Sequence, residues 1–327
     1  MMTRVLGQFA DGLRSGVVGW NRFWFSPSSP RLLGLMRVFV GAMLVYTHVV
    51  WSLALRTFFA DEGVLPTEYA RLLYADGFGL WTHFAWIQSS WAMWTVHFLA
   101  IATMCLFACG LWTRVTAILS FLFLVSYAHR ATGALFGLDQ ISCFLTLYLA
   151  IGPSGAAFSI DQWLDKKHTK FATAAPSVMA NIALRLMQIH LCVVYLFAGL
   201  SKLQGGSWWN GEAIWGAIAS ADYQTWDFTW LAHAMWFVNL ATLVAIAWEI
   251  SYPFLIWNRS ARPFYLALAV MIHLGIGVLM GMIPFGTIMI IANMSFLPAN
   301  IFAGEPSAAL GGDPRAQVAP QTESRRK

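Results

Sequence analysis

The sequence predicts an all-α, polytopic membrane protein: a transmembrane helical bundle of about eight spans. Of the 327 residues, 58% are hydrophobic and only 11% are charged, whereas an ordinary soluble domain carries roughly 25% charged residues. The 17 tryptophans and 24 phenylalanines fit a lipid-facing body with aromatic belts at its interfaces. Most apolar residues gather in runs close to the ~20 residues that a tilted helix needs to cross the hydrocarbon.

The chain starts with an amphipathic segment, residues 1–30, which we expect to lie in the cytoplasmic interface of the membrane. Leu6, Phe9, Leu13 and Val17 recur at helical spacing among arginines, and a cluster of aromatic residues follows them. An amphipathic helix of this kind binds in the plane of the interface rather than across the bilayer. The Ser- and Pro-rich stretch 26–30 then separates this segment from the membrane domain.

Residues 31–303 form the expected transmembrane domain. Its eight apolar spans cover residues 32–55, 91–112, 115–135, 140–158, 180–203, 231–257, 263–283 and 285–302. Pro284 interrupts the last apolar run, so a hairpin or a re-entrant end is an alternative to two full spans at that position. Residues 304–327 have nothing apolar to bury, and we expect them to form a disordered cytoplasmic tail.

The basic residues indicate the orientation of these spans. If both termini are cytoplasmic, the inner segments hold 14 of the 20 Lys and Arg residues: Arg4, Arg14, Arg22, Arg31, Arg114, Lys166, Lys167, Lys170, Arg259, Arg262, Arg315, Arg325, Arg326 and Lys327. Cytoplasmic loops carry such an excess in multi-pass proteins of the cell membrane. Because the basic residues are scattered rather than collected on one stripe, we expect membrane lipids, and no nucleic acid, as partners.

The fifth span, residues 180–203, is the most unusual because it carries Arg185, Gln188, His190 and Lys202 among apolar residues. A charge in the hydrocarbon costs at least ~2.5–3.5 kcal/mol on insertion scales, so such residues need partners or a function. Lys202 falls at the outer end of this span. Two interpretations are open: the side chain snorkels to the outer headgroups, or it is a buried amine that acts as a general base.

The end of this span resembles a known family. Tyr195, Gly199, Lys202 and Leu203, followed by Trp209, are similar to the Tyr-x-x-x-Gly-x-x-Lys-Leu…Trp signature of the HTTM family, the membrane domain shared with vitamin K-dependent gamma-carboxylase. Further similar features, over residues 31–302, are Arg37 in a Gly-Leu-Met-Arg-Val first span, Asp139 before the fourth span, the Ser159-Ile160-Asp161 pattern after it, and His273 with Phe285 twelve residues later.

In the carboxylase, the matching lysine is implicated as the base that deprotonates reduced vitamin K, after which the oxygenated quinone removes a proton from a peptide glutamate and carbon dioxide adds. The resemblance therefore implies catalytic roles for Lys202 as base, His273 and Asp139. It implies a substrate pocket formed by Tyr195, Trp209, His190 and Phe285. If the protein is an enzyme, the resemblance makes it a carboxylase- or epoxidase-like one.

Two departures from the carboxylase change the expected substrate. The Asn-His pair of its fourth-span motif has no counterpart near Asp139, and residues 304–327 offer no counterpart to the domain that captures its peptide. We therefore expect a cavity on the outer side of the membrane for a quinone-like or other lipid-soluble molecule, rather than peptide carboxylation.

The remaining charges inside the spans are expected to be structural. Arg37 and Arg185 fall near the inner interface, where snorkelling accounts for each. Glu249 falls late in the sixth span and is expected to neutralise one of these arginines.

Asp139 has several open interpretations besides the catalytic one. It could pair with Lys202 or Arg130, or simply begin its helix, where a carboxylate favours the positive end of the helix dipole. The four cysteines lie inside apolar runs and are expected to pack as small hydrophobes, so no metal site is expected.

Two other classes of function stay open beside an enzyme. One is a non-catalytic accessory factor that works with a separate protein in the maturation or export of a secreted peptide. The other is a transporter, which is disfavoured because the sequence shows no inverted repeat and no matching pair of broken spans.

Overall fold

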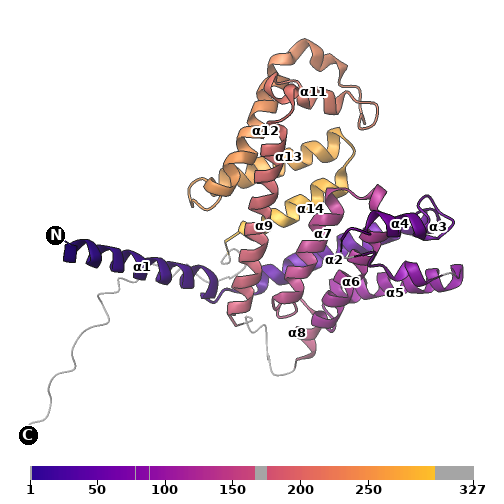
Figure 1. The fold of residues 1–327 in the computed structure, drawn as a ribbon, viewed down its shortest axis with the longest axis horizontal. Helices are drawn as coiled ribbons and strands as arrows, with labels where there is room; N and C mark the ends of the chain where they lie inside the picture. Colours follow the sequence, from indigo (N-terminus) through magenta and orange to yellow (C-terminus); the bar gives the residue numbers. More distant parts are fainter. Residues whose placement is uncertain (1, 78, 88, 166–174, 299–327) are drawn as a thin grey trace, which may run out of the picture.

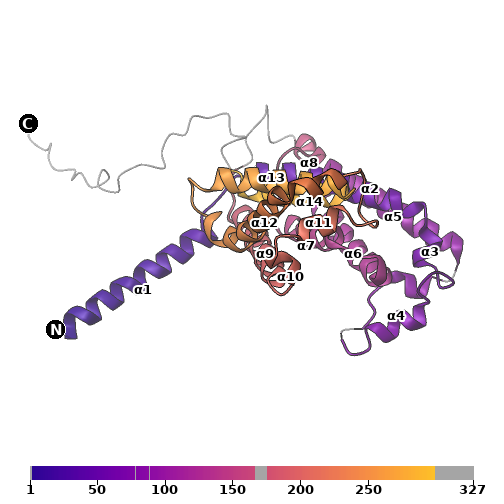
Figure 2. The same ribbon diagram turned by 90° about the horizontal axis from the view of Figure 1, so that it is seen from above.

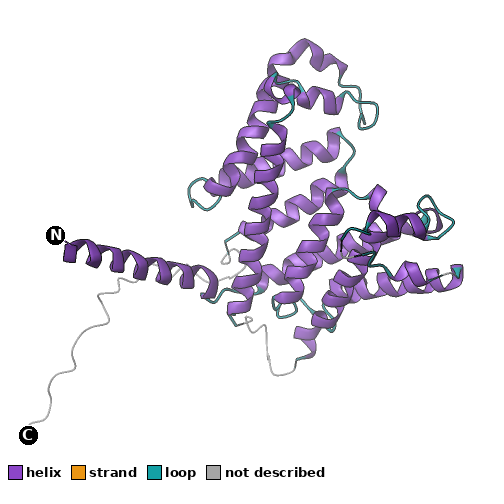
Figure 3. Ribbon diagram, viewed as in Figure 1, coloured by secondary structure: helices purple, strands orange, loops and turns teal. Residues whose placement is uncertain are grey.

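The computed structural model describes residues 2–77, 79–87, 89–165 and 175–298, with side chains from Asp11 onward. Within these ranges the chain forms helices joined by loops and no strand (Figure 3); an isolated β-bridge joins Ser28 and Ser177. The all-helical prediction is therefore confirmed. The expected tail, 304–327, and the inner-loop residues Lys166, Lys167 and Lys170 lie outside the described residues.

The helices are α1 (Met2–Phe25), α2 (Arg31–Ser52), α3 (Leu55–Phe59), α4 (Thr67–Leu73), η1 (His83–Trp86), α5 (Ser90–Cys109), α6 (Thr113–Arg130), η2 (Thr132–Ala134), α7 (Gly137–Ile151), α8 (Ile160–Leu164), α9 (Val178–Lys202), α10 (Gly206–Trp209), α11 (Ala213–Ile218), η3 (Thr229–Ala234), α12 (Met235–Leu255), α13 (Arg262–Leu279), α14 (Ile283–Asn293) and η4 (Met294–Phe296). In the described part of the chain, five segments are long and apolar enough to cross a membrane: Arg31–Ser52, Ser90–Cys109, Val178–Lys202, Thr229–Leu255 and Arg262–Leu279.

Two of the expected spans contain helices that are too short to cross a membrane. In the fourth, α7 ends at Ile151, because Gly152, Pro153 and Gly155 follow and the chain continues through turns to residue 158. In the last, α14 has 11 residues, which amount to about 17 Å at 1.5 Å per residue. Neither helix alone reaches across a hydrocarbon layer of ~30 Å.

Helix α9 occupies the middle of the bundle, with α12 on one side and α7 and α14 on the other (Figure 1). The buried core joins residues of α2, α7, α9, α12 and α14 into one cluster. Small residues let the backbones approach: a Cβ on Gly41 of α2 would lie 2.6 Å from Cα of Ala108 on α5. Membrane helices pack through small residues in this way.

Helix α1 extends away from the rest of the molecule (Figures 1 and 2). The α9 residue Asn181 donates hydrogen bonds of 2.8 Å to the carbonyls of Phe23 and Trp24 at the end of α1. Arg185, one turn later, donates to the Phe23 carbonyl at 3.2 Å and lies over the Phe23 ring. The polar groups near the start of α9 therefore hold the last turn of α1.

Candidate functional site

A cavity of about 610 Å³ lies among α6, α7, α9, α12, α13 and α14. Its volume is within the range of small-molecule sites, which are mostly apolar and contain a few placed polar groups. The lining follows this pattern, because leucine, isoleucine, valine, phenylalanine and methionine side chains surround a small polar set. That set consists of Gln140, Cys143, His190, Tyr195, Lys202, Glu249 and His273.

The cavity wall contains an ion pair. The Nζ atom of Lys202 donates to Oε1 and Oε2 of Glu249 at 2.8 and 2.7 Å, and the two side chains are 24% and 13% exposed. Trp208 adds an indole ring 5.3 Å from the same nitrogen. The Lys202 side chain is therefore held against a carboxylate beside a cavity.

The expected pairing of Glu249 with Arg37 or Arg185 is wrong, because Glu249 pairs with Lys202. The reason lies in the relative height of the two helices. Lys202 ends α9, whereas Glu249 lies fourteen residues after Met235, the first residue of α12. Since each residue adds 1.5 Å, α12 begins about 20 Å beyond this contact, and the end of α9 does not lie level with the start of α12.

Gly199 brings these two helices close enough for the ion pair. A Cβ at this position would lie 2.8 Å from Cγ1 of Ile250 and 3.2 Å from Cβ of Glu249. Lys202 lies three residues further along α9, on the same face of the helix. The Gly and Lys of the family-like signature therefore contribute to one helix contact, Gly199 by its lack of a side chain and Lys202 by its charge.

Two histidines line the cavity at different points. His273 on α13 donates from Nδ1 to the carbonyl of Ala269 at 2.8 Å, so in the neutral ring Nε2 is the hydrogen-bond acceptor. His190 on α9 has Nδ1 2.9 Å from the Tyr148 hydroxyl, and its ring stacks on Phe144 with centroids 4.1 Å apart. His273 therefore offers an acceptor, whereas His190 contributes part of an aromatic wall.

A buried amide fixes Tyr195. Asn293 at the end of α14 donates to the Tyr195 hydroxyl at 2.8 Å and accepts from the Tyr252 hydroxyl at 2.7 Å. Its Nδ2 also donates to the carbonyl of Met289 at 2.9 Å. Asn293 was not singled out from the sequence. Its only signal was a lone amide in an apolar run, a residue type that bonds neighbouring helices in membranes.

Five of the seven residues expected in the catalytic and pocket sets therefore line one cavity: Lys202, His273, Tyr195, His190 and Phe285. Trp209 lies outside it. That residue is 66% exposed on α10, and its Nε1 donates to the carbonyl of Leu203 at 2.7 Å. The indole thus fastens α10 to the end of α9.

Asp139 also lies outside the cavity. Its Oδ2 accepts from the backbone N–H of Phe136 at 3.1 Å, which caps the first turn of α7. Of the interpretations left open by the sequence, the structure places this carboxylate at the beginning of its own helix, in hydrogen-bond contact with neither Lys202 nor Arg130.

Arg37 and Asp161 organise the opposite end of the bundle. Arg37 is fully buried and donates to the carbonyls of Ser154 at 2.9 Å, Ala157 at 3.4 Å and Phe158. Snorkelling is therefore the wrong description of Arg37. Its guanidinium satisfies carbonyls of the turns that replace the end of the expected fourth span, and the contacts with Ser154 and Ala157 are buried.

Asp161, just after these turns, caps the start of α6. Its carboxylate accepts from the backbone N–H groups of Trp112 and Thr113, both at 2.8 Å, and from the Thr113 hydroxyl at 2.7 Å. Burial raises the pKa of the Asp161 carboxyl, but the hydrogen bonds from Thr113 and Trp112 together outweigh it and lower that pKa below its usual value. The Ser-Ile-Asp pattern is thus a helix-capping element.

Fold and site together define this chain as an integral, multi-pass membrane protein with a cavity inside its helical bundle. Comparisons with protein-family models, with curated proteins and with solved structures found no match. In the described part of the chain, no group of three or more His, Cys, Asp or Glu residues is placed to hold a metal ion.

Proposed function

We propose that this protein binds a quinone-like or other lipid-soluble molecule in the Lys202 cavity and removes a proton from it, with Lys202 as general base. The observation that carries the proposal is the bidentate contact between Lys202 and Glu249 in the wall of a cavity of about 610 Å³. Aromatic and apolar walls suit a ring with an isoprenoid or acyl tail, and the few polar groups suit its oxygen atoms.

The pair supplies a route to a neutral amine. If the ammonium proton of Lys202 moves to the Glu249 carboxylate, both groups become neutral, a form that a poorly solvated site favours over separated charges. The amine then takes the proton of a substrate O–H: that O–H bond breaks, an N–H bond forms, and the substrate anion faces the new ammonium. His273, whose Nε2 is an acceptor, can hold a second hydroxyl of the substrate.

The same proposal sets this protein in a cell membrane with about eight spans, both termini in the cytoplasm and the cavity toward the outer side. The positive-inside distribution supports this orientation. Helix α1 would then lie in the cytoplasmic interface, with its exposed apolar side chains in the lipid. These side chains are Leu13, Val17, Val18 and Trp20.

Purified protein tests the proposal through its bound molecules and its lysine. We expect mass spectrometry of an organic extract to find a quinone or a related lipid-soluble ring compound with the wild type, and less of it with Gln140→Trp, which fills the cavity. Lys202→Arg keeps the charge and stays protonated, so we expect it to retain the molecule but to lose turnover.

The proposed enzyme is rejected if Gln140→Trp does not reduce the amount of bound molecule and Lys202→Arg does not reduce turnover. The accessory function would then be favoured, and a stable protein partner in a detergent pull-down is its expected sign.

A further inference from the structure

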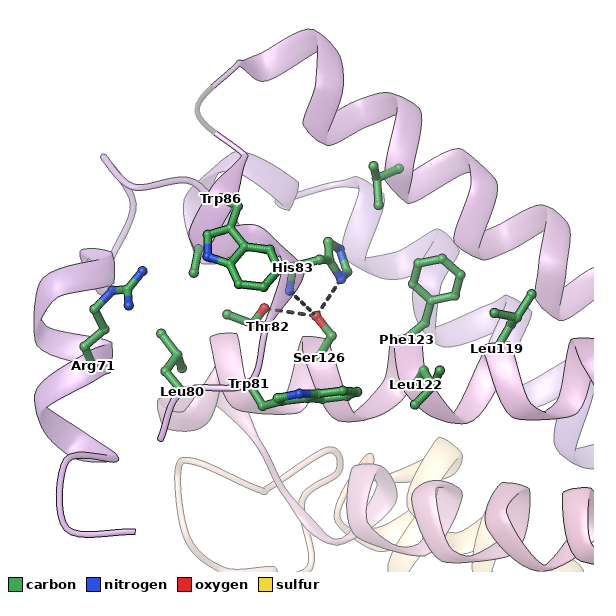
Figure 4. Close-up of a pocket in the computed structure, with 12 residues that line it drawn as sticks. Arg71, Leu80, Trp81, Thr82, His83, Trp86, Leu119, Leu122, Phe123 and Ser126 are labelled. Carbon is green, nitrogen blue, oxygen red and sulfur yellow. Dashed lines mark hydrogen bonds between the residues drawn. The ribbon is translucent and has the colours of Figure 1, made fainter. Parts of the chain in front are cut away.

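A second cavity, of about 410 Å³, lies where the loop between α2 and α5 meets α5 and α6 (Figure 4). Arg71 on α4, the stretch 80–86, Val96 on α5 and several residues of α6 line it. It shares no lining residue with the Lys202 cavity. The proton-transfer function proposed above does not use it.

A chain of hydrogen bonds joins Thr82, Ser126 and His83 at the inner wall of this cavity. Thr82 Oγ1 accepts from the Phe84 backbone N–H at 3.3 Å and lies 3.0 Å from Ser126 Oγ. Ser126 Oγ accepts from the His83 backbone N–H at 3.0 Å and lies 2.5 Å from His83 Nδ1. If Thr82 donates to Ser126, the Ser126 hydrogen goes to Nδ1, and the neutral ring carries its own hydrogen on Nε2.

In this arrangement the Nε2–H is a donor without an acceptor. The atom is buried, and no described residue lies within hydrogen-bond distance of it. Burial lowers the pKa of His83 to about 4, so the ring is neutral near pH 7. Buried polar groups are almost always satisfied, so an oxygen of a bound ligand would complete His83 Nε2. Because the atom has almost no accessible surface, the side chains around it must move aside for that contact to form.

The rest of the wall is apolar and reaches the surface of the bundle. Leu119 and Leu122 on α6 line the cavity and are also exposed. In Figure 4 the indoles of Trp81 and Trp86 lie on either side of the His83–Ser126 contact. An alkyl chain lying along α6 would therefore pass from the surrounding lipid toward the His83–Ser126 contact.

Arg71 supplies a cation at the same cavity. Arg56 in this loop already pairs with Glu62 at 2.6 Å, and the buried Arg130 donates to the carbonyl of Ala60 at 2.6 Å. Among the described residues, Arg71 has no such acceptor, and Glu68, one turn earlier on α4, does not come within ion-pair distance. A cation left free beside an apolar groove is suited to an anionic head.

We propose that this cavity binds a single-chain amphiphile with an anionic head, a carboxylate or a phosphate monoester. Its chain lies against Leu119, Leu122 and Phe123, and its head oxygens accept from His83 Nε2 and Arg71. Both sources of this chemistry, a free fatty acid and a lysophospholipid, are components of membranes, and the competitors used in the test distinguish them.

The test uses the full chain in detergent and a diazirine analogue of palmitic acid as the probe. We expect photolabelling within residues 80–86 and 119–126, and competition by palmitate or lysophosphatidic acid but not by hexadecanol, which has the same chain without the charge. Whichever of the two anions competes at lower concentration identifies the head group.

Matched variants separate the head contact from a general effect on the fold. Arg71→Gln should weaken the probe's apparent affinity by about threefold to tenfold, the size of one charged hydrogen bond at a partly exposed site. Arg71→Lys should keep most of the affinity, and Arg56→Gln should change nothing, since Arg56 already has its carboxylate. Lys202→Ala should leave this labelling intact, which separates it from the other cavity.

Two results would overturn the proposal. One is labelling spread over the bundle with no preference for residues 80–86 and 119–126. The other is competition by hexadecanol as strong as that by palmitate, with affinity unchanged in a folded Arg71→Gln protein.

Discussion

Lys202 and Glu249 meet although one ends its helix and the other lies in the second half of its own. The contact, with both N–O distances at or below 2.8 Å, requires α9 to end beside the interior of α12. The cavity therefore has its charged wall at the point where α9 stops, with α12 continuing past it. Both charged side chains are therefore part of the cavity wall and are mostly buried.

Replacing one partner of this ion pair should destabilise the protein more than replacing both partners together. We expect Lys202→Met and Glu249→Leu each to lower the free energy of unfolding by roughly 1–3 kcal/mol, because each leaves one charge alone in a poorly solvated wall. The double variant should cost less than the sum of the two. Thermal unfolding in detergent, followed by tryptophan fluorescence, measures all three.

The exposed pair Arg56–Glu62 is the matched control for this cycle, since its side chains are 60% and 61% exposed. Glu62→Gln should cost no more than about 1 kcal/mol. Strict additivity at Lys202 and Glu249 would contradict the direct contact.

Arg37→Gln should be among the most harmful single changes. Three carbonyls, of Ser154, Ala157 and Phe158, would lose this donor, and the contacts with Ser154 and Ala157 are buried. Buried groups left unsatisfied cost about 1–3 kcal/mol each, so we expect a loss of at least ~2 kcal/mol or failure to fold. Arg14→Gln, on the exposed part of α1, should stay within about 0.5 kcal/mol. Yield and the unfolding midpoint in detergent give the comparison.

The sequence predicts which residues form helices better than it predicts how far each helix is shifted along its neighbour. Apolar runs place α2, α5, α9, α12 and α13 near their observed positions because each run must satisfy its backbone internally in lipid. The depth of a residue in one span, however, says nothing about which residue of another span lies beside it. Glu249 was therefore assigned to the wrong partner.

The other differences have local causes that a hydropathy pattern does not contain. The expected span 140–158 looked continuous in the sequence because the residues of its turns are mostly apolar. The carbonyls of these turns accept hydrogen bonds from Arg37, a contact between distant parts of the chain that hydropathy does not reveal. Asn293 was overlooked because one amide in an apolar run has no pattern, and its role depends on two tyrosines from other helices. The family-like signature, in contrast, brought Tyr195, Gly199 and Lys202 to attention through their spacing alone.

Asp161 should make stability depend on pH in the acid range. Its pKa is lower in the folded protein than its usual value of 3.8, so its contribution is complete above about pH 5 and is lost as the pH falls below the usual value. We expect Asp161→Asn to cost roughly 1 kcal/mol at neutral pH, as for other helix caps. The difference in unfolding midpoint between wild type and variant should be constant from pH 5 to 8 and shrink near pH 3.

The stability of the protein should also depend on pH through His83, at higher pH values than through Asp161. Because burial lowers the pKa of His83 from 6.5 to about 4, the folded protein holds the neutral ring while the unfolded chain becomes protonated first. The stabilisation is present above pH 6.5 and is lost as the pH falls toward 4. In the His83→Gln variant the unfolding midpoint should therefore change less between pH 7 and pH 4.5 than it does in wild type, and thermal unfolding in detergent over this pH range measures it.

Gly199 provides the most direct test of how α9 and α12 position the ion pair. An added methyl group would lie 2.8 Å from Cγ1 of Ile250 and 3.2 Å from its backbone nitrogen, closer than packed atoms allow. The helices must separate or Ile250 must shift, and overpacking of this kind costs about 1–3 kcal/mol. Gly199→Ala should therefore lower the unfolding midpoint despite the higher helix propensity of alanine.

Gly275 on α13 is the matched control, because a Cβ there meets nothing within 4 Å. Gly275→Ala should leave the midpoint unchanged or raise it. Since separation of α9 from α12 also draws Lys202 away from Glu249, the cost of Glu249→Leu should be smaller in a Gly199→Ala background than in wild type. An undiminished cost there, with Gly199→Ala itself neutral, would show that the ion pair does not depend on the close approach of these two helices.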